Sequence, residues 1–112
     1  CRVTITSGGD LGIGALGWYQ DDGYYMPNFI VSKASSNIQV NIHSDMPDGA
    51  VLIFRSAGGG TINVSSRNLS DKFQWGSQWD DWSKPSAAVA PGVLNIFVYD
   101  KSSHTWYAHG IS

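Results

Sequence analysis

The sequence contains no glutamate, one cysteine, few charged side chains and no long apolar run. Because Cys1 has no second cysteine to pair with, its thiol is free or bridges two molecules, and a disulfide scaffold or Cys-x-x-Cys site is excluded. Charged residues make up 14% of the chain, against roughly 25% in average soluble proteins. The net charge of −2 offers no basic surface to nucleic acid. No apolar run approaches the ~20 residues that a transmembrane segment needs.

The remaining composition is that of a folded domain. Hydrophobic residues make up 42% of the 112-residue chain and aromatic residues 12%, which is too much apolar surface for a disordered protein. The length predicts a single domain over residues 1–112. Polarity comes mainly from Ser, Asn, Thr and Gly, and two N-glycosylation triplets occur at Asn63 and Asn68. These features together predict a secreted protein.

Short alternating segments between turn signals predict strands. Residues 37–44 alternate most clearly, with Ile38, Val40 and Ile42 facing one way. Residues 50–56 form a continuous apolar run, as expected of a central strand, and residues 93–100 predict a further strand. About eight or nine strands are expected in all. We detect no internal repeat and no alternation of strands with helices.

This pattern predicts an all-β fold. The first choice is an antiparallel two-sheet β-sandwich of Ig-like or lectin-like jelly-roll type, and the alternative is a small closed β-barrel. Asp22-Gly23 is a typical two-residue hairpin turn. Residues 73–85 contain Gly76, paired aspartates and Pro85, so an irregular connection with at most one helical turn is expected there.

The same stretch, residues 73–85, holds three of the five tryptophans among polar neighbours. If all three indoles cover the core, the stretch is structural, because tryptophan is highly buried on average. An exposed indole in such a polar segment instead indicates a binding site. An indole can stack on the C–H face of a sugar ring, and carboxylate and amide groups can bond the hydroxyls. The predicted ligand-binding residues here are Trp75, Gln78, Trp79, Asp80, Asp81 and Trp82.

A second aromatic cluster surrounds the predicted hairpin turn. Its candidate binding residues are Trp18, Tyr19, Asp22 and Tyr24. The structural alternative is an aromatic-decorated hairpin in which the rings pack across the strands. The sequence does not decide between the two interpretations.

Catalytic and metal sites are not predicted. Adjacent aspartates on a strand face opposite ways, whereas the two carboxyl groups of a glycosidase must converge on one bond. The aspartate pairs lack the spacing of a calcium loop, and no zinc-binding histidine motif occurs. We therefore expect neither enzymatic activity nor a cofactor or metal.

The function predicted from the sequence is that of a small secreted carbohydrate-binding protein, a lectin or carbohydrate-binding module whose partners are glycans. It would combine aromatic stacking with hydrogen bonds from Asp, Asn and Gln. The alternative is a secreted interaction or toxin-like protein whose exposed aromatics meet a protein partner or a membrane surface. Assembly into a homo-oligomer stays open.

Overall fold

The computed structural model of the chain describes residues 2–5, 9–12, 19–20, 23–24, 28–76 and 83–110, with side chains described for Thr4 and for residues 28–76 and 83–110. This part of the chain consists of strands, turns, bends and irregular segments, without a helix. In chain order the strands are β1 (Arg2–Ile5), β2 (Gly9–Gly12), β3 (Tyr19–Gln20), β4 (Gly23–Tyr24), β5 (Phe29–Ser32), β6 (Ile38–Ile42), β7 (Val51–Ser56), β8 (Ile62–Ser66), β9 (Lys72–Trp75), β10 (Ser86–Val89), β11 (Leu94–Asp100) and β12 (Thr105–His109).

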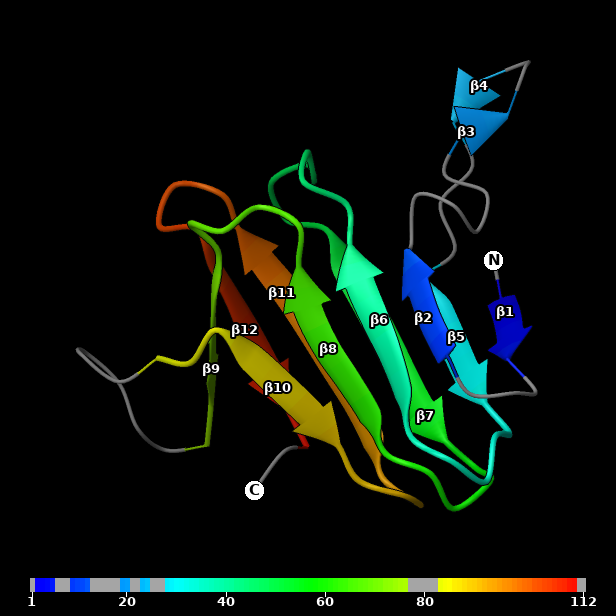
Figure 1. Cartoon of the computed structure of the whole chain (residues 1–112). Coiled ribbons are helices and arrows are strands. Elements are labelled where there is room, and N and C mark those ends of the chain that lie inside the picture. Colours follow the sequence, from blue (N-terminus) through cyan, green and yellow to red (C-terminus); the bar gives the residue numbers. More distant parts are fainter. Residues whose placement is uncertain are drawn as a thin grey trace.

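The strands form two stacked sheets and one short hairpin (Figure 1). The six-stranded sheet has the order β1-β5-β7-β11-β12-β9, and the four-stranded sheet has the order β10-β8-β6-β2. β3 and β4 pair only with each other, and Figure 1 shows this hairpin standing away from the sheets. The prediction of an all-β chain with two sheets is confirmed, and the arrangement is compatible with a β-sandwich.

The pairing of the strands is mixed, so the prediction of purely antiparallel sheets is wrong. The neighbours β5 and β7 run parallel, as do β6 and β8, β1 and β5, β2 and β6, and β9 and β12. For β5 and β7, and for β6 and β8, the reason is that each connection crosses to the other sheet, and the strand between the two neighbours returns the chain to the same end. The pairs β8–β10, β7–β11 and β11–β12 are antiparallel. The Ig-like or jelly-roll type is not confirmed, and the described strands do not close a barrel.

The registers of the parallel pairs reveal a short repeat that the sequence analysis did not detect. Phe29 of β5 pairs with Ile53 of β7, and Ile38 of β6 pairs with Ile62 of β8, which is the same offset along the chain. Each turn of this flattened coil therefore contributes one strand to each sheet. Within the paired segments 29–42 and 53–66, three pairs of residues are identical at this offset, namely Ser32 and Ser56, Ile38 and Ile62, and Val40 and Val64.

The core lies between the two sheets. The inward side chains of β6, Ile38, Val40 and Ile42, are buried as the alternation predicted. The six-stranded sheet contributes aromatic rings to this core. Phe97 makes edge-to-face contacts with Phe54 and Phe73 at centroid distances of 5.1 and 6.0 Å. Such pairs are worth about 0.5–1.5 kcal/mol each beyond the area they bury. At the end of the core near the β11–β12 turn, the rings of Tyr99 and Trp106 stack.

Two further element predictions require correction. Residues 72–75 form a regular edge strand, β9, because they find a pairing partner in β12, which pattern alone does not reveal. β7 is central in its sheet but is buried on one face only, with Leu52 and Phe54 inward and Val51 exposed. The outer face of the four-stranded sheet is polar, as predicted for residues 37–44, whereas the outer face of the six-stranded sheet is largely apolar.

Candidate functional site

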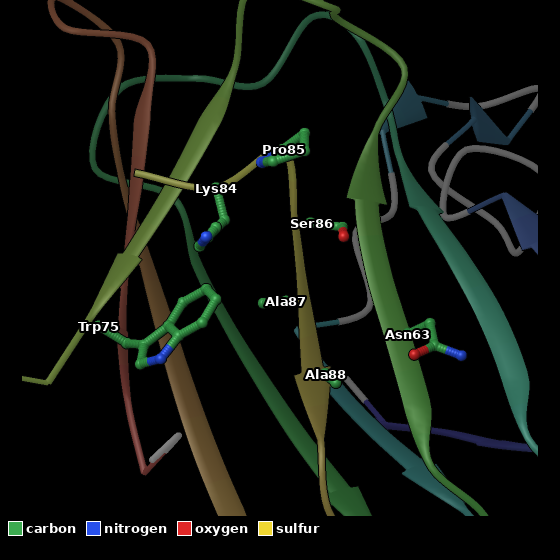
Figure 2. A pocket seen from close by; sticks show the side chains of 7 residues that line it. All are labelled: Asn63, Trp75, Lys84, Pro85, Ser86, Ala87 and Ala88. Carbon is green, nitrogen blue, oxygen red and sulfur yellow. The ribbon is translucent and has the colours of Figure 1, made fainter. Parts of the chain in front are cut away.

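A groove of about 290 Å³ opens at the edge of the sandwich where β9 and β10 approach each other (Figure 2). Its lining residues are Asn63, Trp75, Lys84, Pro85, Ser86, Ala87 and Ala88. Figure 2 shows the indole of Trp75 on the side formed by β9 and Asn63 on the opposite side, on β8.

Trp75 reaches the groove because β9 is an edge strand with a fixed register. Phe73 pairs with Trp106 and Trp75 pairs with Ala108, so both aromatic rings of β9 point inward. Phe73 is fully buried, whereas Trp75, at the end of the strand, is only partly buried against the core. Gly76 follows with φ of 77°, a conformation that ends the strand and that favours glycine. The indole is thus held in place while part of its surface stays accessible.

The other wall of the groove is fixed by a β-bridge. The backbone N–H of Phe73 donates to the carbonyl oxygen of Lys84 at 2.8 Å, and the N–H of Lys84 donates to the carbonyl oxygen of Phe73 at 2.9 Å. β10 begins directly afterwards, with Ala87 turned inward and Ala88 outward. Because these side chains are small, space remains beside the indole. Backbone pairing therefore fixes the segments that carry Trp75 and Lys84 relative to each other.

The described lining residues combine one flat apolar surface with several polar groups. The Asn63 amide offers both donors and an acceptor, the Ser86 hydroxyl offers one of each, and Lys84 carries the only charge in this set. No described lining residue is a carboxylate. The set can bind a neutral polar ligand with an apolar face, and it lacks a described pair of acids for hydrolysis.

Next to the groove, the outer face of the four-stranded sheet carries a ladder of hydrogen-bonded polar side chains. Gln39 Nε2 donates to Ser65 Oγ at 2.8 Å, and Ser65 Oγ donates to Asn41 Oδ1 at 2.8 Å. Asn63 pairs in the strand register with Gln39 on one side and with Ala88 on the other, so it lies between the ladder and the groove that it lines. These bonds hold Gln39 and Asn41 in defined orientations and extend the polar surface beyond the groove.

The structure places only part of the predicted site. Trp75 lines the groove, and Tyr19 pairs with Tyr24 across the β3–β4 hairpin. The remaining predicted residues, Trp18, Asp22, Gln78, Trp79, Asp80, Asp81 and Trp82, lie outside the described residues. The segment 77–82 connects Gly76 to Ser83, and thereby the two strands whose bridge closes the groove.

Asn63 and Lys84 were not predicted as groove residues, and a buried polar cluster was not predicted either. Asp71 is almost completely buried, and its carboxylate accepts hydrogen bonds from Ser66 Oγ at 2.6 Å and from the Tyr99 hydroxyl at 2.7 Å. His104 Nδ1 lies 3.4 Å from the same carboxylate. Burial, and then the bond to Asp71, raises the pKa of Tyr99. The sequence carries no signal for this cluster, because its members come from distant elements.

The cluster is well suited to a structural role. It ties the turn before β9 to β11 and to the β11–β12 turn, where Lys72 N–H also donates to the carbonyl oxygen of His104 at 2.8 Å. The described residues contain no group of three or more His, Cys, Asp or Glu side chains that could hold a metal ion. That same part of the chain has no helix with the length and apolarity needed to cross a membrane.

Comparison of the chain with protein-family models, with curated proteins and with solved structures found no match. The chemistry of the groove and of the surfaces around it is therefore the basis for assigning a function.

Proposed function

We propose that the protein binds carbohydrate in the groove between β9 and β10, as a secreted binding module without catalytic activity. The observation that carries the proposal is the partly buried indole of Trp75, held beside the Asn63 amide, the Ser86 hydroxyl and the Lys84 ammonium. A sugar ring presents an apolar face to an indole and hydroxyls to amide and hydroxyl groups. This groove offers both kinds of partner within one small volume.

The polar ladder on the four-stranded sheet supports the proposal. Its side chains already bond one another, so little conformational entropy is lost when a ligand binds to them. The predicted residues Gln78, Trp79, Asp80, Asp81 and Trp82 belong to the segment that joins the groove's two strands, and they remain candidates for further contacts. The cluster of Trp18, Tyr19, Asp22 and Tyr24 remains a second candidate.

A glycan array followed by titration of any bound glycan tests the proposal. Trp75→Ala should weaken binding by roughly 1–3 kcal/mol, the scale of a buried large apolar side chain. Since Trp75 also packs against the core, its melting temperature must be measured alongside. Asn63→Ala removes a groove amide on the outer face of β8, and it should weaken binding while leaving the melting temperature nearly unchanged.

The matched control is Leu69→Ala, which changes an exposed apolar residue outside the groove and should leave affinity unchanged. If no glycan binds, the carbohydrate function is wrong. If a glycan binds with equal affinity to wild type, Trp75→Ala and Asn63→Ala, then the site is not this groove.

The second candidate function is that of a protein-interaction module. It is favoured by a separate observation, the apolar outer face of the six-stranded sheet, where exposed side chains of β7, β11 and β12 lie together. A protein that binds no glycan but binds another protein through this face would support the second candidate over the first.

A further inference from the structure

The outer face of the six-stranded sheet exposes more apolar side-chain area than a solvated sheet face usually does. Of the six large hydrophobic residues exposed in the described part of the chain, five lie on this face, and the sixth, Leu69, lies in the turn after β8. The five, with their exposed fractions, are Val51 (39%), Leu94 (49%), Ile96 (36%), Val98 (40%) and Tyr107 (46%). A contiguous apolar surface of this kind on a soluble domain usually marks an interaction site.

The strand registers show that these side chains are neighbours. Read across β7, β11 and β12, the outward rows are Val51–Val98–Tyr107, then Ile53–Ile96–His109, and then Arg55–Leu94. Side chains opposite one another on neighbouring strands lie about 4.5–5.5 Å apart at Cβ, so each row is continuous. β5 extends the surface, since its partly buried Phe29 and Val31 pair with Ile53 and Arg55.

Charged side chains lie at both ends of this apolar face, Arg55 at one end and, at the other, aspartates together with Lys72 and with Lys101, whose Nζ lies 3.6 Å from Asp45. Arg55 is exposed at one end, beside Leu94. Asp100 and Asp48 lie at the other end. Asp100 lies two residues after Val98 on β11, on the same face of the strand. Asp48 Oδ1 accepts the N–H of Lys101 at 2.9 Å. Hydrogen bonds from Ser102 and Ser103 lower the pKa of Asp100, so its carboxylate is charged at neutral pH. Lys72 lies at this end too, but on the edge strand β9.

We propose that this face binds a second copy of the chain, sheet against sheet, around a two-fold axis that runs across the strands. Such an axis leaves each strand opposite its own copy and reverses its direction. Arg55 of one copy then approaches Asp100 of the other, and the reciprocal pair forms by symmetry. An axis along the strands would instead place both Arg55 residues at one end and both Asp100 residues at the other.

A second copy fits the face better than a lipid surface does. Anionic lipids attract a rim of Lys and Arg, whereas this face has aspartates at one end and the chain carries a net charge of −2. The β-branched rows resemble the inner face of a sandwich, which packs against another sheet at about 10 Å. The sheet forms a broad face of a molecule with extents of 36 × 35 × 20 Å, which has room for the ~800 Å² per partner of a standard interface.

The test is sedimentation analysis of the whole chain over a dilution series. We expect wild type to form a dimer and Val98→Asp, which places a charge at the centre of the row Val51–Val98–Tyr107, to be monomeric with an unchanged circular dichroism spectrum. Leu69→Asp is the matched control, because it adds the same charge at an exposed apolar residue outside the face, and it should remain dimeric. Wild type that stays monomeric at the highest concentration overturns the proposal, including when it binds anionic vesicles through this face.

Charge reversal tests the orientation and does not depend on how Val98→Asp folds. Arg55→Asp and Asp100→Arg should each weaken the dimer by about tenfold, and the double variant should regain most of the loss, because the reversed charges again face each other. Melting temperatures of the monomeric forms control for the turn contacts of Asp100 with Ser102 and Ser103. If the dimer affinity of the double variant falls by the product of the two single-variant decreases, the proposed axis is wrong.

Discussion

At the scale of single residues, Asp71 shows how this chain stabilises a buried charge. A carboxylate removed from water is costly unless donors surround it. Here Ser66 and Tyr99 each donate to a different oxygen, and His104 adds a third polar neighbour. The consequence extends to Tyr99, whose hydroxyl is buried and donates to a negative group, so that loss of its proton would place two charges side by side.

The raised pKa of Tyr99 predicts a loss of stability in alkaline solution. Tyrosine in the unfolded chain titrates near its ordinary value of 10.0, whereas folded Tyr99 keeps its proton above that pH. The stabilising contribution is therefore fully present below pH 10 and declines as the pH rises toward the pKa of the folded state. Urea unfolding of wild type should show a fall in the free energy of unfolding above about pH 10.

Tyr99→Phe is the control for this effect. It removes the hydroxyl and should cost about 1–3 kcal/mol at neutral pH, because the Asp71 carboxylate loses a donor. Above pH 10 its free energy of unfolding should decline less steeply than that of wild type. If the free energy of unfolding falls equally with pH in both proteins, then the pKa of Tyr99 is the same in the folded and unfolded states, which contradicts the prediction.

At the scale of elements, the sequence predicted strands well and their partners poorly. The alternation at Ile38, Val40 and Ile42 indicates a strand because it depends only on which side chains avoid water. β9 was missed, since Lys72–Trp75 alternates over only four residues before Gly76 and becomes a regular strand by pairing with β12. The parallel pairs were missed for a related reason. Which sheet a strand joins depends on the path of each connection, and the connections here carry turn residues that are compatible with either path.

The connections before β6 and before β8 predict a sharp effect of mutation. They pack backbone against backbone, with Gly60 N–H donating to the carbonyl oxygen of Ala34 at 3.1 Å. A Cβ added at Gly60 would collide with the carbonyl groups of Ser36 and Ala34. We expect Gly60→Ala to cost about 1–3 kcal/mol or more, the scale of overpacking, since backbone atoms cannot rotate away.

Chemical unfolding of Gly60→Ala checks this prediction. Ser35→Ala is the control, because Ser35 is exposed in the facing connection and its substitution should change the free energy of unfolding by less than about 0.5 kcal/mol. Equal stability of Gly60→Ala and wild type would mean that the two connections separate without cost, which contradicts their close packing.

At the scale of the whole molecule, the sequence identified one component of the site and none of its surroundings. Trp75 was selected because an indole among polar residues is unusual. Asn63 and Lys84 were not selected, since Asn63 lies on β8, in the other sheet from Trp75, and approaches the indole only when β9 and β10 meet. The apolar outer face of the six-stranded sheet was not predicted for a similar reason. The run 50–56 was interpreted as a central apolar strand, and only its place in the six-stranded sheet shows that Val51 and its neighbours face solvent.

The groove and the apolar face together predict how the molecule binds a glycan surface. The proposed axis keeps each strand opposite its own copy, so both β9 edges, and with them both grooves, come to the same side of the dimer. Two sites on one side can engage one polymeric glycan, and linked binding of this kind commonly strengthens attachment by 10²-fold or more. Val98→Asp should therefore weaken binding to a densely immobilised glycan by roughly 100-fold.

Affinity for a single soluble oligosaccharide should stay unchanged in Val98→Asp, because Val98 lies on the outer face and not among the lining residues of the groove. Trp75→Ala should behave oppositely and weaken both kinds of binding while the protein stays dimeric. Surface plasmon resonance on dense and sparse glycan coatings separates the two effects. Equal binding of wild type and Val98→Asp to the dense coating would show that the two grooves do not act together, even if the dimer and the sugar site both exist.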